Sequence, residues 1–120
     1  MHELAIAQSI AETVEVKAAE CSAAHVRHVR LRIGEASGIV IDSLAFCFEM
    51  VGSLSPILEG AHLLIERVPH RAYCRHCAKE FDVTNFVARC PTCEEWSAQV
   101  VSGTELEILD MEIEARSQQS

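Results

Sequence analysis

Residues 74–93 read CRHCAKEFDVTNFVARCPTC, a stretch with two Cys-x-x-Cys pairs that are separated by twelve residues. A two-residue spacer lets both sulfurs of a pair reach one ion, and structural zinc prefers four such ligands in a tetrahedron. The twelve-residue connection fits a short hairpin that returns the second pair to the first. The stretch therefore predicts a zinc ribbon whose ligands are Cys74, Cys77, Cys90 and Cys93.

Other uses of these cysteines are less consistent with the pattern. A redox Cys-x-x-Cys needs one pair and not two, and the zinc deaminase signature has a proline before the pair, whereas Pro91 lies inside it. An iron or iron–sulfur site has the same ligand set and stays open. His70 and His76 lie near the pairs as further candidate ligands. Four cysteines leave no open coordination position, so we expect a structural metal ion.

Outside the ribbon, hydrophobic periodicity predicts two helices and three strands. An amphipathic helix is expected over 4–18, with Cys21 extending its buried stripe, and a second helix over 44–51, capped by Asp42 or Ser43. The second helix is apolar nearly all round, because Phe46 and Met50 lie opposite its core positions, so it is either deeply buried or part of a protein contact. Strands are expected over 25–33, 62–68 and 104–113.

The predicted strand at 25–33 alternates Val29, Leu31 and Ile33 with charged residues, which indicates one buried face and one wet face. The expected fold is α+β, a three-stranded sheet with two helices and an inserted zinc-ribbon module. The predicted domains are 1–69 plus 104–115 for the α/β part and 70–103 for the ribbon, followed by a flexible polar tail at 116–120.

The chain has 120 residues and a net charge of −8, with no apolar run long enough to span a membrane. The start of the chain lacks the features of a signal peptide, so we expect a cytoplasmic protein. The ribbon has a neutral balance of charges and no basic stripe, which argues against a nucleic-acid-binding zinc ribbon, the main alternative function. A small nickel or zinc hydrolase is a second alternative. The sequence contains no Ser/His/Asp order and no P-loop, so we expect a protein that is not an enzyme.

The chain begins Met1-His2-Glu3, a sequence that can chelate a metal ion. The terminal amine, the deprotonated amide of His2 and its imidazole can form fused rings, and a carboxylate could complete a square plane. Such nitrogen-rich planar sets suit Ni(II) or Cu(II). Taken alone, His2 is more readily explained as a solvated surface residue.

The chain resembles the HypA/HybF family of hydrogenase nickel-incorporation proteins. The resemblance rests on Met1-His2-Glu3-Leu4, on the segment IGEASG at 33–38, on Ser43–Phe46 with Phe48 and Glu49, on the cysteine pairs, and on Gly103–Leu106. It implies that Met1, His2 and Glu3 bind nickel and that the four cysteines bind zinc. Asp42 is either an extra nickel ligand or a helix cap, and the cap is favoured.

The same resemblance implies a metallochaperone that helps to insert Ni(II) into the large subunit of a nickel–iron hydrogenase. It also implies a nickel-binding maturation GTPase as a partner. The sequence does not give the oligomeric state, and a homodimer is one alternative.

Overall fold

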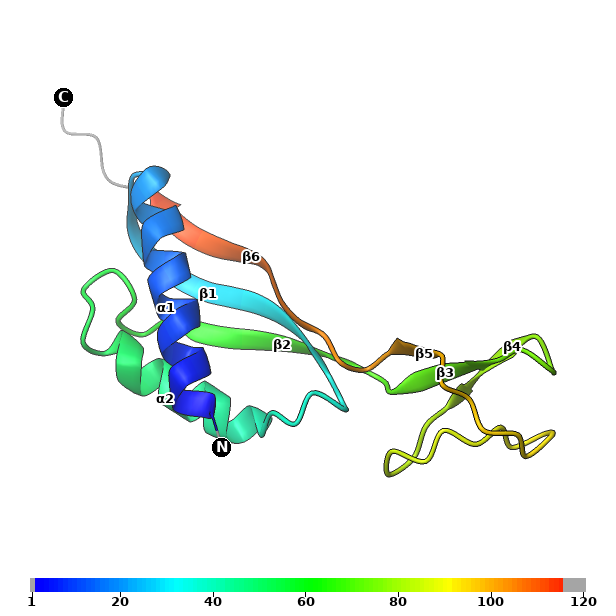
Figure 1. The fold of residues 1–120 in the computed structure, drawn as a ribbon. Helices are drawn as coiled ribbons and strands as arrows, with labels where there is room; N and C mark the ends of the chain where they lie inside the picture. The colour runs from blue at the N-terminus through cyan, green and yellow to red at the C-terminus, as the bar shows by residue number, and fades with distance from the viewer. Residues whose placement is uncertain (1, 116–120) are drawn as a thin grey trace. The chain divides into compact units, whose positions relative to one another are not determined.

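A computed structural model describes residues 2–115, and its ribbon is drawn in Figure 1. The predicted tail at 116–120 lies outside the described residues, as does Met1. The elements in chain order are α1 (Glu3–Glu20), β1 (Ala23–Gly34), α2 (Ile41–Gly52), β2 (His62–Val68), β3 (Arg71–Cys74), β4 (Lys79–Asp82), β5 (Val100–Ser102) and β6 (Leu106–Ala115).

The strands form two three-stranded sheets, with the orders β2-β1-β6 and β4-β3-β5. The first sheet carries the two helices, and the second belongs to the cysteine segment, so the predicted α+β fold with an inserted ribbon is confirmed. Among the described residues, the backbone divides into two compact units, one made of 2–31, 39–65 and 108–115 and the other of 32–38 and 66–107. No helix in the described part of the chain is long and apolar enough to cross a membrane.

Helix α1 buries the stripe that its spacing predicts, namely Ala7, Ile10, Ala11, Val14 and Ala18. The prediction for Cys21 was wrong, because this thiol is exposed. The helix ends at Glu20 and Cys21 is its C-cap, so the side chain no longer follows the helical repeat that would have placed it in the core.

Helix α2 starts earlier than its polar residues suggest. Its N-cap is Val40, in an extended conformation with no side-chain cap, so the predicted cap at Asp42 or Ser43 was wrong. Asp42 lies in the first turn of the helix and is not buried. In the first turn of a helix an acidic side chain still interacts favourably with the positive end of the helix dipole. Asp42 therefore suits this position although it does not cap the helix.

Two hydrogen bonds hold α1 and α2 together at both ends of their contact. The Val40 amide donates to Glu3 Oε2 at 3.0 Å, and Ser55 Oγ donates to Glu15 Oε2 at 2.7 Å. Glu3, at the start of α1, contacts the N-cap of α2, and Glu15, later in α1, contacts Ser55 just after α2. The two helices therefore run in the same general direction. Figure 1 shows both helices starting at the same end of the pair.

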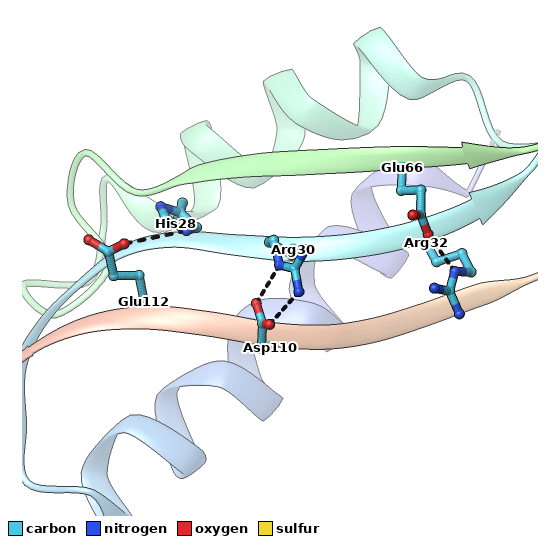
Figure 2. A network of polar contacts seen from close by, with 6 residues as sticks. All are labelled: His28, Arg30, Arg32, Glu66, Asp110 and Glu112. Atoms are coloured by element: carbon cyan, nitrogen blue, oxygen red, sulfur yellow. Dashed lines mark hydrogen bonds and ion pairs between the residues drawn. The ribbon is translucent and has the colours of Figure 1, made fainter.

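The first sheet has the polar face that the alternation in β1 predicts. Val29, Leu31 and Ile33 are buried, while the other face carries the row of side chains shown in Figure 2. Arg30 makes a two-armed contact with Asp110, with N–O distances of 2.8 and 2.6 Å, and Arg32 Nε lies 2.6 Å from Glu66 Oε2.

These pairs are exposed, and such pairs contribute only about 0–1 kcal/mol each. Arg30 lowers the pKa of Asp110, and Glu66 raises the pKa of Arg32. The cations of β1 are therefore matched by carboxylates on β2 and β6. Within the described strands, this face therefore has no row of unpaired basic side chains that could contact a phosphate backbone. The ribbon likewise has a neutral balance of charges.

Candidate metal centre

The four predicted cysteines come together in the ribbon. Their sulfur atoms all lie within 4.8 Å of one another, with 3.5 Å between Cys74 and Cys93 and 3.8 Å between Cys77 and Cys90. A tetrahedral zinc ion with Zn–S bonds of about 2.3 Å requires sulfur atoms about 3.8 Å apart. A disulfide requires about 2.05 Å, and all six cysteines are free thiols. The spacing of the sulfurs therefore fits a tetrathiolate zinc site.

Each pair of cysteines lies on a tight turn of the same kind. The residue after the second cysteine has a left-handed backbone in both turns, with φ of 55° at Ala78 and 65° at Glu94. Within the first turn, the Cys77 amide points at Cys74 Sγ at a distance of 3.4 Å. Amides directed at sulfur stabilise thiolates, which are the form that zinc binds. Neither position is a glycine, so the sequence offers no clear signal for these turns.

The surroundings of the thiols act on their acidity in opposite ways. Burial raises the pKa of Cys77 to about 12, whereas the backbone N–H of Cys93 lowers the pKa of Cys90 to about 6. A cation between the sulfurs would displace the proton from the first and would meet a ready thiolate at the second. Binding of a metal ion to the cluster is therefore expected to release a proton.

The same cysteines supply much of the ribbon's core. The buried cluster of this module consists of Ala72, Cys74, Phe81, Val83 and Cys90. Strand β3 pairs antiparallel with β4 and β5, and Ala72 lies opposite Phe81. Only one of the five core side chains is large, so we expect the module to depend on a metal ion for its stability.

The two histidines near the cluster do not join it. Among the described residues, the one group of side chains placed to hold a metal is the four cysteines. His76 is exposed, and the His70 ring packs edge-on against Phe86 with 5.6 Å between centroids. The His70 amide donates to Glu35 Oε1 at 3.1 Å.

At the other end of the chain, His2 is exposed and forms the N-cap of α1. Its carbonyl accepts a hydrogen bond from the Ile6 amide at 2.9 Å, and its side chain makes no capping bond. The backbone of His2 is thus fixed by the first helical turn, while the imidazole takes no part in the cap. Met1 lies outside the described residues.

Glu3 differs from its neighbours because its side chain is buried, with 6 % of its surface exposed. Its carboxylate accepts the hydrogen bond from the Val40 amide described above. Sequence reasoning missed this contact, because no local pattern links residues 37 positions apart. The structure therefore brings Glu3 to the start of α2.

Comparison with known proteins gives consistent results. Residues 1–113 match the family model described as "Hydrogenase/urease nickel incorporation, metallochaperone, hypA". The chain is 44% identical over 114 residues to the hydrogenase maturation factor HypA of Geobacter metallireducens, covering 95% of this chain and all of that protein. It is 38% identical over 120 residues to the Dehalococcoides mccartyi factor of the same name, covering both chains fully. In fold it is similar to the solution structure of the nickel metallochaperone HypA from Helicobacter pylori, with a TM-score of 0.67 at 24% identity, covering 97% of this chain and 100% of that one.

Proposed function

Because the chain belongs to the HypA family of hydrogenase and urease nickel-incorporation metallochaperones, we propose that it binds Ni(II) at its N-terminus and helps to insert it into the large subunit of a nickel–iron hydrogenase. In this proposal Met1 contributes its amine, His2 its amide and imidazole, and Glu3 is their local partner at the nickel site. The four cysteines hold a structural zinc ion, and the protein carries out no catalysis of its own.

The observation that best supports a terminal nickel site is the setting of His2. This residue is exposed, its imidazole is not used to cap α1, and the helix holds its backbone in place. An exposed site with few supporting contacts lets a receiving protein replace the ligands one at a time. Selective binding combined with easy release is what delivery of a metal requires.

We assign the two metal ions to different parts of the chain. We propose that the α/β part, 1–69 plus 104–115, carries nickel and that the ribbon at 70–103 serves as a zinc-stabilised module. The partners would be a maturation GTPase and the hydrogenase large subunit, and we place the transfer in the cytoplasm.

Metal content and pH test this function directly. Untagged protein is expected to bind one nickel and one zinc per chain, and His2→Ala is expected to lose nickel while it retains zinc. Nickel affinity should fall between pH 8 and pH 6, because the imidazole must be neutral and an amide proton must leave. Mass spectrometry and competition with a metallochromic chelator would measure both. A nickel affinity that stays constant over this range, or survives His2→Ala, would contradict the proposal.

The role of Glu3 can be separated from that of His2. The bond from the Val40 amide supports Glu3 as a residue that holds the N-terminus on the helix pair. Glu3→Ala removes the acceptor and is expected to lower nickel affinity about 10–100-fold, the usual effect of losing a supporting partner. Glu3→Gln keeps an acceptor oxygen and should cost less than about tenfold.

Chelator competition measures both Glu3 variants, with zinc content and circular dichroism as controls. If Glu3→Gln loses as much nickel affinity as Glu3→Ala, the carboxylate charge itself acts on nickel. The positioning role would then be wrong, while the terminal site would stand.

A further inference from the structure

Helix α2 is apolar on two opposite faces. Leu44, Phe48 and Gly52 form a buried stripe at four-residue spacing. Phe46, Met50 and Leu54, which we call the outer stripe, repeat the same spacing two positions later. Two residues correspond to about 200° of rotation in a helix, so Phe46 and Met50 face away from the buried stripe. Leu54 follows in the turn just after α2.

The outer stripe is exposed. Phe46 has 68% of its surface accessible, Met50 46% and Leu54 85%. A surface helix normally carries polar residues on the side opposite the core, so large apolar side chains repeated along that side are unusual. Contiguous exposed apolar residues of this kind mark sites of protein interaction.

The charged residues of α2, Asp42 and Glu49, are both acidic. Asp42 and Glu49 are seven residues apart, so they lie on the same row of α2, directly beside the outer stripe. No lysine or arginine occurs in residues 33–66. One histidine is close, since His62 Nδ1 lies 3.8 Å from Glu49 Oε2, and this pair is exposed.

We propose that the outer stripe of α2 is a docking surface for a basic amphipathic helix of a partner protein. The apolar side of that helix would pack on Phe46, Met50 and Leu54, and its Lys or Arg residues would face Asp42 and Glu49. Helices bind helices in this way through residues spaced by three and four positions. Aromatic and methionine side chains are enriched at such contacts, and methionine adapts to the shape of its partner.

The same charges disfavour the other occupants. A second copy of the chain would bring one acidic row towards another, and each copy has a net charge of −8. An anionic lipid surface would be repelled for the same reason, since membrane-binding helices carry Lys and Arg beside their apolar face. The docking surface does not include Met1, His2 or Glu3, so it can be tested independently of the proposed nickel site.

The test uses a fluorescein-labelled helical peptide with leucines at four-residue spacing and a flanking row of lysines. A second peptide has glutamates in place of the lysines. Fluorescence anisotropy with the full zinc-loaded chain should show binding of the basic peptide alone, weakened by added salt. Phe46→Ser should reduce the affinity at least about tenfold, as for a central aromatic anchor. Leu54→Ser, at an even more exposed position outside the helix, should act in the same direction.

Val16→Ser is the matched control, because Val16 is also an exposed apolar residue, with 58% of its surface accessible, but lies on α1. It should leave peptide binding unchanged. Glu49→Lys should weaken the basic peptide and favour the acidic one. The proposal is overturned if Phe46→Ser and Leu54→Ser bind as well as the parent chain or if Val16→Ser weakens binding equally. It is also overturned if Phe46→Ser instead abolishes self-association in sedimentation or binding to phosphatidylglycerol vesicles.

Discussion

Placing Gly-Ser before Met1 is expected to lower nickel affinity by more than about 100-fold, beyond the upper end of what the loss of a supporting partner costs. The addition turns the terminal amine into a peptide bond, so one proposed nitrogen ligand is lost and the fused rings cannot form. Every side chain remains, including His2 and Glu3. Chelator competition gives the affinity, and loss of the square-planar absorption band of Ni(II) reports the change in geometry.

The controls for this extension are zinc content and far-ultraviolet circular dichroism, and neither should change. The cysteine cluster lies in the ribbon, far along the chain from the first residues, and the apolar core of α1 begins at Ala7. The His2→Ala variant with the native start should show the same loss of nickel, because it removes the imidazole. If the extended chain binds nickel as tightly as the native one, the site is made of side chains alone, and Asp42 becomes the next residue to test.

Replacing Cys90 by serine is expected to release zinc and unfold the ribbon. Cys90 is fully buried, supplies one of the four sulfurs and forms part of the small ribbon core. Structural zinc contributes about 10–16 kcal/mol of apparent binding energy in small zinc modules, and most of this would be lost with one ligand. Hydrogen exchange should show fast amides over 70–103 and slow amides in α1, β1 and α2, which have a core of their own.

Cys21→Ser is the matched control, since it removes a thiol that is exposed and lies outside the cluster. It should keep one zinc per chain and leave exchange in the ribbon unchanged. A Cys90→Ser protein that still holds zinc with native affinity would rule out the tetrathiolate site. Loss of protection in α1 and α2 together with the ribbon would show that the two parts of the chain do not fold independently.

Sequence alone predicted most of the fold because the relevant signals are local. The spacing of the cysteines identified all four members of the cluster, and the repeat in α1 identified its buried stripe. The alternation in β1 predicted its polar face, which Figure 2 shows with its carboxylate partners. In the helix and the strand the period of the pattern equals the period of the backbone, so neighbouring residues carry the information. In the cysteine pairs the two-residue spacer carries it, because it brings both sulfurs to one ion. The nickel site at Met1, His2 and Glu3 stays a prediction.

Tertiary structure decided what meets each of these faces. The repeat of α1 continued to Cys21, but the helix ended one residue earlier and left that thiol exposed. Periodicity showed that α2 is apolar on both sides, but not that the outer stripe would be left exposed by the rest of the described chain. The bond between Glu3 and Val40 exists only because two helices from distant parts of the sequence pack together. A local pattern states which side of an element is apolar or charged, whereas its partner depends on contacts between segments far apart in the chain.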